Sequence, residues 1–239
     1  YSQEVLSRNL PIWASYEPGS TFKIITTSAA VEEGVVDLEK DHFYDSGSVN
    51  IDGSILRCWK AGGHGAQTFL QVLQNSCNPG FVKMGQLLGK QTLFNYIDKF
   101  GFGNKTGIDL NGEGKGIIFD LNQVGNVELA TTAFGQGVSV TAIQQVAAVS
   151  AVVNGGTLYE PYIVKSISEK ETGNIIDQTK KQKIRQVISK KTSTIMRHAL
   201  ESVVAKGGGK SAYIEGYRIG GKTGTAQKVK NGVYMVGNY

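Results

Sequence analysis

Apolar residues recur at helical spacing in several stretches of the chain. The chain breaks at Pro18-Gly19, and an apolar periodicity then predicts a helix over residues 20–33 that ends at Gly34. The same period predicts further helices over residues 68–73, 79–88, 91–100, 142–153 and 193–204. The stretch 142–153 is strongly apolar, so we expect that helix to be buried.

The remaining stretches have the turn residues and alternation of loops and strands. Residues 102–126 are rich in glycine and asparagine and are predicted to be loop. Residues 217–228 are predicted to form a strand whose glycines let a substrate backbone lie close. Short strands are predicted over residues 36–66 and, with a turn at 171–174, over 157–188. Helices around a sheet indicate an α+β fold.

Composition and charge narrow the class of protein. At 239 residues, with 40% hydrophobic and 19% charged residues, the chain can bury a core and resembles ordinary globular proteins in make-up. No apolar run is long enough to cross a bilayer. The net charge of +5 has two interpretations: the basic residues either lie on solvated faces without a specific partner, or they attract the protein to an anionic membrane or wall polymer. We expect no nucleic-acid partner, because no aromatic residues interleave with the basic cluster of Lys180, Lys181, Lys183, Arg185, Lys190 and Lys191.

Three short motifs carry candidate chemistry. In Ser20-Thr21-Phe22-Lys23, both functional side chains lie on one helix face, and a neutral Lys23 could take the proton of the Ser20 hydroxyl. Ser20 also opens its predicted helix, where unpaired N–H groups and the helix dipole would stabilise an oxyanion. Further along, Ser76-Cys77-Asn78 and Lys222-Thr223-Gly224-Thr225 supply a proton relay and a cationic group for a carboxylate. Each motif alone is weak, but the three in this order form a specific signature.

The residues around these motifs resemble the class B penicillin-binding proteins. The resemblance rests on residues 16–23 (YEPGSTFK), 76–78 (SCN), 131–141 (TTAFGQGVSVT) and 221–226 (GKTGTA), and it extends over essentially the whole chain. It implies the transpeptidase fold shared by penicillin-binding proteins and serine β-lactamases, a mostly helical lobe with an antiparallel sheet. It also implies a D,D-transpeptidase that is acylated by D-Ala-D-Ala stem peptides, cross-links peptidoglycan and reacts covalently with β-lactams, without a cofactor for catalysis.

The resemblance assigns a role to each motif residue by position. The implied catalytic residues are Ser20 as nucleophile, Lys23 as base, Ser76 as relay to the leaving amine, Asn78 as partner of Lys23 and of the substrate amide, and Lys222 as the positive end of the site. The implied substrate-binding residues are Thr223, Gly224 and Thr225, which would hold the terminal carboxylate. The backbone N–H groups of Ser20 and Thr225 would form the oxyanion hole.

The resemblance also sets expectations for domain organisation and location. Residues 1–239 are expected to be a segment of one transpeptidase domain, incomplete at both ends, because the family's membrane anchor, pedestal domain, first strands and C-terminal strands and helix are not found in it. We expect the protein to lie at the extracytoplasmic face of the membrane, held by an anchor outside this sequence. The resemblance also implies a membrane glycosyltransferase as its partner. Cys58-Trp59-Lys60, Gly63-His64-Gly65 and Cys77 are similar to family members that act in sporulation, which implies the spore cortex and the forespore membrane.

Two other functions stay open from the sequence. A β-lactamase or D,D-carboxypeptidase would need a base that clears the acyl-enzyme quickly, and in class A β-lactamases a glutamate supplies it. Glu113 and Glu128 follow the second motif, but neither stands in an E-x-x-x-N pattern, whereas a carboxylated lysine of the class D type stays open. A non-catalytic β-lactam sensor would keep the same motifs.

Potential metal ligands lie between the first two motifs. A cysteine, an acid and two histidines suit a tetrahedral structural zinc ion, which would stabilise a loop-rich stretch without joining the chemistry. The candidate ligands are His42, Asp45, Cys58 and His64. Their spacings, H-x2-D and C-x5-H, are not a standard zinc pattern.

Two alternatives compete with this zinc site. In an extended triplet Cys77 faces away from Ser76 and Asn78, so it could form a disulfide with Cys58 behind the active site. Alternatively, both cysteines are free and the histidines are ordinary surface residues.

Overall fold

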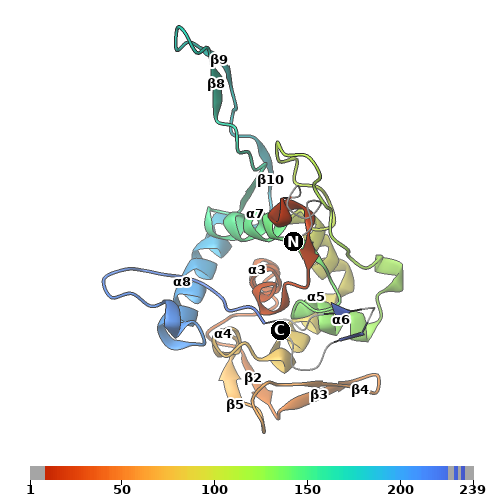
Figure 1. Ribbon diagram of the computed structural model, residues 1–239. Coiled ribbons are helices and arrows are strands. Elements are labelled where there is room, and N and C mark those ends of the chain that lie inside the picture. The colour runs from red at the N-terminus through yellow and green to blue at the C-terminus, as the bar shows by residue number, and fades with distance from the viewer. Residues whose placement is uncertain (1–8, 226–228, 231–232, 235–239) are drawn as a thin grey trace.

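The structure, a computed structural model, describes residues 9–225, 229–230 and 233–234 (Figure 1). The helices are α2 (Leu10–Trp13), α3 (Lys23–Glu32), α4 (Phe69–Gln74), α5 (Asn78–Lys99), α6 (Asn126–Ala133), α7 (Ala142–Val153) and α8 (Lys190–Lys206), with 3-10 turns η1 (Gly19–Thr21), η2 (Leu121–Gln123) and η3 (Lys210–Ala212).

Strands in the described part of the chain pair two by two, all antiparallel. The pairs are β1 (Ser15–Tyr16) with β6 (Val140–Thr141), β2 (His42–Asp45) with β5 (Gly65–Thr68), β3 (Ser48–Ile51) with β4 (Ser54–Arg57), β7 (Thr157–Tyr159) with β10 (Lys183–Gln186), β8 (Ser166–Ser168) with β9 (Ile175–Gln178), and β11 (Val229–Lys230) with β12 (Val233–Tyr234). Strands β2 and β5 contact α4, and β2 and β4 contact α5. This mixture of helices and strands confirms the α+β prediction.

The helix α3 lies at the centre of the fold, with α5, α7 and α8 in contact with it (Figure 1). Its residues 23–30 are all buried. Polar groups in this stretch have partners, since Thr26 donates to the Ala133 carbonyl oxygen at 2.8 Å and Thr27 donates to the Lys23 carbonyl oxygen at 2.7 Å. Because Lys23 begins this central helix, its amine is carried into the interior.

Most predicted helices are confirmed, and α7 has the predicted bounds. Its N-cap is Thr141, whose hydroxyl accepts from the backbone N–H of Gln144 in a capping box. The two helices predicted on either side of Gly89 form one run, α5, interrupted by a φ of +72° at that glycine. The sequence pattern misses α6, because eight residues are too short for a clear apolar period and packing against α5 supplies the stability instead.

The strand predicted over residues 217–228 is wrong in its described part. Residues 217–225 have no strand partner in the structure, and residues 226–228 lie outside the described residues. The backbone of this segment instead meets α8, where the Gly221 N–H donates to the Leu200 carbonyl oxygen at 3.2 Å. A strand needs a neighbouring ladder to pair its polar groups, and here a helix provides the contact.

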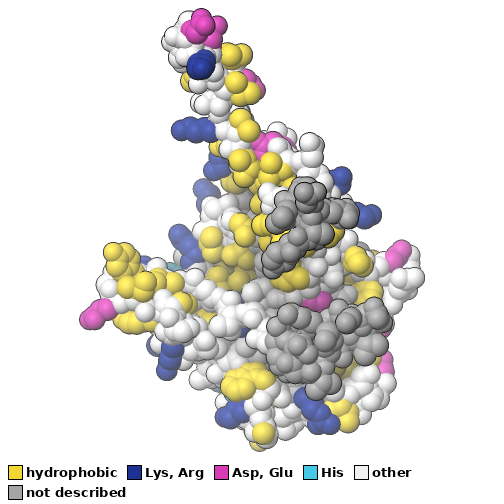
Figure 2. Space-filling model, in the orientation of Figure 1, with side chains coloured by type: hydrophobic (Ala, Val, Ile, Leu, Met, Phe, Trp, Pro, Cys, Tyr) yellow, Lys and Arg dark blue, Asp and Glu magenta, His cyan; other side chains and the backbone are white. Residues whose placement is uncertain are grey.

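The hairpin β8–β9 projects away from the body of the fold (Figure 1). Its Ile167, Ile175 and Ile176 side chains are exposed, and hydrophobic and charged side chains are visible along it in Figure 2. Among the described residues, no helix has the length and apolar character to cross a membrane.

Candidate active site

Ser20 stands on η1, the 3-10 turn that leads into α3, so the α-helix begins at Lys23 rather than at Ser20. The turn starts at Gly19, whose φ of +52° is left-handed. The Gly19 N–H donates to the Gly135 carbonyl oxygen at 3.0 Å, and a Cβ at position 135 would overlap the Gly19 carbonyl. This close backbone contact fixes the turn that presents Ser20.

Lys23 is fully buried, and its amine meets several oxygen atoms. The Lys23 Nζ lies 2.6 Å from Asn78 Oδ1, 2.9 Å from the Ser76 carbonyl oxygen, and 3.0 Å from both Ser76 Oγ and Ser20 Oγ. Burial and, after it, the Lys222 ammonium lower the pKa of Lys23 well below its usual value. The environment therefore favours the neutral amine.

A neutral amine fits the geometry around Lys23. It has two N–H groups and one lone pair, and the Ser76 carbonyl and Asn78 Oδ1 can only accept hydrogen bonds. These two oxygens therefore take the N–H groups, which leaves the lone pair for a hydroxyl. Ser20 Oγ, at 3.0 Å, can donate its proton to that lone pair.

The turn between α4 and α5 brings Ser76 and Asn78 to the same side of the chain. Ser76 has a φ of +53°, a left-handed conformation that costs a non-glycine residue about 1–3 kcal/mol. Its Oγ donates to Ser20 Oγ at 3.0 Å and accepts from Lys222 Nζ at 2.9 Å. The triplet is not extended as predicted, yet Cys77 does face away from this hydrogen-bond chain.

The third motif borders the same site. Burial lowers the pKa of Lys222 to about 8. Gly224 lies against the first motif, where an added Cβ would stand 2.8 Å from Thr21 Cγ2, so a larger residue would push the segment away. Thr223 and Thr225 line the cleft of about 1090 Å³ that Ser20, Ser76 and Asn78 also line. The structure thus brings all three motifs together.

The cleft contains residues that the motifs do not include. Arg57, Lys206 and Lys210 line it, and none of its described lining residues is acidic. A cationic cleft suits a substrate with a free carboxylate. These basic residues come from three separate segments and follow no motif, so the sequence carried no signal for them.

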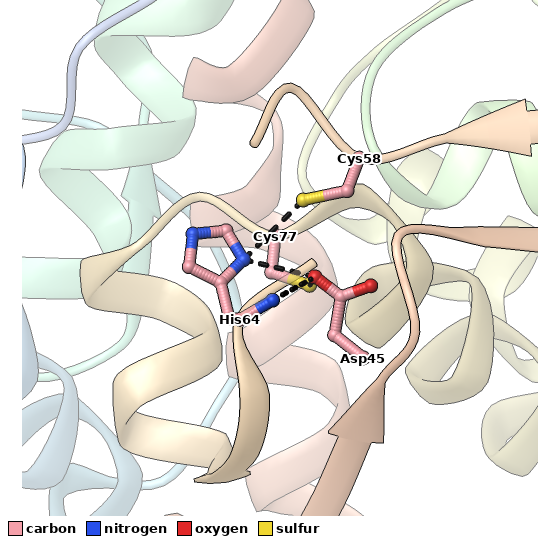
Figure 3. A group of neighbouring side chains, drawn as sticks. All are labelled: Asp45, Cys58, His64 and Cys77. Atoms are coloured by element: carbon pink, nitrogen blue, oxygen red, sulfur yellow. Dashed lines mark hydrogen bonds and ion pairs between the residues drawn. The ribbon is translucent and has the colours of Figure 1, made fainter. Parts of the chain in front are cut away.

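A second group of side chains meets behind the active site, on the side of the turn toward which Cys77 points (Figure 3). It comprises Asp45, Cys58, His64 and Cys77, whose ligand atoms all lie within 4.8 Å of one another. His42 is not part of it. That side chain is exposed and bonds through Nδ1 to the Lys40 carbonyl oxygen at 2.8 Å. Cys77 takes the place predicted for His42, because β2 directs Asp45 inward and His42 outward.

Hydrogen bonds organise this group around Asp45. His64 Nδ1 lies 2.9 Å and Cys77 Sγ 3.3 Å from Asp45 Oδ2. Burial alone would raise the pKa of Asp45, but hydrogen bonds from Cys58, His64, the Gly47 N–H and Cys77 hold it well below its usual value. Burial raises the pKa of Cys58, and it raises that of Cys77 to about 12. Both cysteines are free thiols in the structure, which does not contain the predicted alternative of a Cys58–Cys77 disulfide.

The two glutamates that a hydrolase could have used have other partners. The Glu113 carboxylate accepts from the Thr106 N–H at 2.6 Å and from the Gly107 N–H at 3.2 Å. The Glu128 carboxylate accepts from the Gly125 N–H at 2.9 Å and caps α6. Both side chains hold loops, and neither lines the cleft at Ser20.

Comparisons with known proteins agree with this geometry. A model of the penicillin binding protein transpeptidase domain matches residues 2–238. The chain is 63% identical over 235 residues to stage V sporulation protein D of Bacillus subtilis (strain 168), covering 98% of this chain and 36% of that protein. It is 31% identical over 223 residues to the peptidoglycan D,D-transpeptidase FtsI of Escherichia coli (strain K12), covering 93% of this chain and 35% of that protein.

A solved structure extends the comparison to the fold. Penicillin-binding protein 3 from Mycobacterium tuberculosis, complexed with ampicillin, aligns with a TM-score of 0.88 at 29% identity, over 95% of this chain and 52% of that one. The chain spans only about a third of the length of the two curated relatives. Motifs, fold and relatives agree, and the chain belongs to the penicillin-binding protein transpeptidase family.

Proposed function

We propose that the protein is a serine-type peptidoglycan D,D-transpeptidase whose nucleophile is Ser20. The observation that carries this proposal is the buried Lys23 amine, which lies 3.0 Å from Ser20 Oγ with its two N–H groups directed to oxygens that can only accept. Desolvation and Lys222 lower the pKa of that amine and so favour the neutral form that a base requires.

Acylation follows from the hydrogen-bond chain. Lys23 takes the proton of Ser20 as Oγ bonds to the carbonyl carbon of the penultimate D-alanine. Ser76 Oγ, which lies 3.0 Å from Lys23 Nζ, gives its proton to the departing amine as the C–N bond breaks and takes the proton held by Lys23 in its place. Thr223 and Thr225 hold the carboxylate of the terminal D-alanine in the basic cleft until that residue leaves.

The second half-reaction returns the enzyme to its starting state. An amine of a neighbouring stem peptide attacks the ester carbonyl, the Ser20 Oγ–C bond breaks, and Ser20 regains its proton. The net result is one amide exchanged for another, with no oxidant or cofactor needed. The cross-link forms because the acceptor is an amine rather than water.

Hydrolysis of the acyl-enzyme is disfavoured by the same cleft. In class A β-lactamases a glutamate activates the water that clears the acyl-enzyme, and none of the described lining residues here is acidic. The Lys23 amine is fully buried and has oxygens at 3.0 Å or less around it, so carboxylation of Lys23 would displace these contacts.

Intact mass spectrometry of the full-length protein with benzylpenicillin tests the proposal. We expect an adduct that persists for many minutes, maps to Ser20, disappears in Ser20→Ala and remains in the control Ser168→Ala on the hairpin. An adduct in Ser20→Ala would move the nucleophile elsewhere. An adduct that clears within seconds while drug is consumed would make the protein a hydrolase.

We further infer that the protein works at the extracytoplasmic face of the membrane, in the spore cortex, beside a membrane glycosyltransferase. Support comes from the 63% identity to a stage V sporulation protein and from the location of peptidoglycan outside the membrane. The test is complementation of a B. subtilis strain that lacks stage V sporulation protein D. The full-length protein should restore spore formation and Ser20→Ala should not, whereas rescue by Ser20→Ala would mean a scaffold without catalysis.

A further inference from the structure

Arg57 lies in the wall of the active-site cleft, and none of the residues that the structure describes pairs with its charge. The residue is exposed, and no described lining residue of the cleft is acidic. A second arginine shows the contrast, since Arg218 lies 2.6 Å from the Glu201 carboxylate. The Arg57 guanidinium is therefore available to an anion that enters the cleft.

The position of Arg57 is fixed by the turn that carries the proton relay. Arg57 ends β4, which is paired with β3, and its carbonyl oxygen accepts from Asn78 Nδ2 at 3.4 Å. On the same segment, the Trp59 Nε1–H donates to the Asn75 carbonyl oxygen at 2.7 Å. These bonds hold the Arg57 segment at residues on either side of Ser76, so its side chain starts beside the reacting groups.

The bound donor peptide passes this part of the wall. In the proposed reaction, Thr223 and Thr225 hold the carboxylate of the terminal D-alanine, while Asn78 bonds to an amide of the peptide on the acyl side of the scissile bond. Because Asn78 also bonds to Arg57, the peptide residue that precedes D-Ala-D-Ala comes next to Arg57. A guanidinium binds a carboxylate through parallel N–H···O bonds, which a neutral amide cannot match in strength.

We propose that Arg57 binds a second carboxylate of the donor stem peptide, carried by the side chain of the residue that precedes D-Ala-D-Ala. This proposal rests on the transpeptidase function proposed above and names the donor that the site prefers. Lys206 and Lys210, which line the same cleft, add positive charge that attracts the anionic peptide. Unlike the terminal carboxylate, this second one stays on the acyl-enzyme after D-alanine leaves.

A matched pair of acyl donors tests the selection on the full-length protein, without an acceptor amine. In both peptides D-thiolactate replaces the terminal D-alanine, so the Ser20 Oγ–C bond forms, the C–S bond breaks, and the released thiol is measured in a single turnover. The residue before D-alanine is α-aminopimelate in one donor and its side-chain amide in the other.

We expect the carboxylate donor to reach half of the maximal acylation rate at about a tenfold lower concentration than the amide donor, as for a hydrogen bond to a charged group. The maximal rates should be alike, because a contact made equally in the ground state and the transition state changes binding alone. Added salt should weaken the preference, since an exposed ion pair is screened. Equal half-saturating concentrations for the two donors would overturn the proposal.

Variants assign the preference to one side chain. Arg57→Gln should remove it, and Arg57→Lys should keep only part of it, because an ammonium group lacks the planar fork of a guanidinium. The control is Arg197→Gln, which removes an exposed arginine of α8 that does not line this cleft and should keep the wild-type preference. A preference that persists in Arg57→Gln, or that is lost in Arg197→Gln, would refute the assignment.

Benzylpenicillin separates this proposal from the proposed function. Arg57→Gln should still form the Ser20 adduct, so that a lost preference reports on the donor side chain rather than on folding. If the unmodified protein forms no adduct and reacts with neither donor, the transpeptidase function fails and the subsite fails with it. If the adduct forms and both donors react alike, only the Arg57 subsite fails.

Discussion

Each side of the Ser76-Cys77-Asn78 turn faces a buried ionisable group, Lys23 on the cleft side and Asp45 on the other, yet the chemistry of the two sides is opposite. On the front, two lysines share one small space, and desolvation with like charge favours the loss of a proton from Lys23. On the rear, Asp45 Oδ2 bonds to the Cys77 thiol and the His64 imidazole, and the Cys58 thiol lies against that imidazole. The side of Lys23 and Lys222 is therefore organised to move a proton, and the side of Cys77 to hold thiols, an imidazole and a carboxylate together, while one tripeptide connects them.

The largest effect should follow from removal of the front-side base. Lys23→Met keeps the length and apolar stem of the side chain but removes the amine. Because general-base catalysis contributes about 10²–10⁴-fold, we expect benzylpenicillin acylation of the full-length protein to fall by about a thousandfold. Stopped-flow or quenched-flow mass spectrometry measures the rate, with the exposed Lys40→Met as control. A loss of less than tenfold would mean that another group accepts the Ser20 proton.

The pH dependence of acylation should separate the two lysines. The neutral form of Lys23 is active, so the rate rises with pH through its lowered pKa. The charged form of Lys222 is active, so the rate falls above its pKa of about 8, by about tenfold per pH unit. Lys222→Arg should abolish the falling limb, since the guanidinium stays charged above pH 12 or so.

The control for this profile is Lys210→Arg in the same cleft, which should keep the wild-type falling limb. A falling limb that persists in Lys222→Arg would assign that titration to a different group. The side of the turn that faces Lys23 would then hold one titrating lysine rather than two.

On the rear side, Asp45→Asn tests whether the cluster supports the turn. The amide fills the same volume but removes the charge that orders the thiols and the imidazole. If the cluster offsets part of the strain at Ser76, acylation should fall by about fivefold, equivalent to about 1 kcal/mol. The exposed Asp177→Asn on the hairpin serves as control. An acylation rate equal to that of the control would mean that the front does not depend on the rear.

Local chemistry was easier to predict from the sequence than spatial neighbours. The spacing of Ser20 and Lys23 is sufficient to place both on one turn, and α7 follows from its apolar period and its Thr141 cap. The fourth donor of the rear cluster was not predictable in this way. Cys77 joins Asp45 only because α5 starts beside the end of β2, a contact between distant segments that no spacing encodes.

The same dependence on distant neighbours explains why the strand predicted after α8 is wrong in its described part. Residues 217–225 have the glycines and alternation of a strand, but strand formation depends on a partner ladder, and in the described residues α8 is the neighbour. The basic residues Arg57, Lys206 and Lys210 likewise meet only in the folded cleft. Motif residues were therefore predictable and their surroundings were not.

Trp59 gives the smallest effect and the finest test, because it touches both sides of the turn. Its Nε1–H donates to the Asn75 carbonyl oxygen at 2.7 Å, one residue before Ser76, and its ring meets His64 edge-on at 5.3 Å between centroids. Trp59→Phe keeps an aromatic ring and removes the hydrogen bond, so the free energy of unfolding should fall by about 1 kcal/mol.

Acylation of Trp59→Phe should change by no more than about twofold, as for surface substitutions in general, because Trp59 is 68% exposed and the turn retains its other contacts. Denaturant unfolding and the acylation rate of the full-length protein measure the two effects, with Tyr217→Phe as an exposed aromatic control. A tenfold slower acylation without further loss of stability would mean that Trp59 itself couples the rear cluster to Ser76. The two sides would then communicate through the indole as well as through the Ser76–Cys77 peptide.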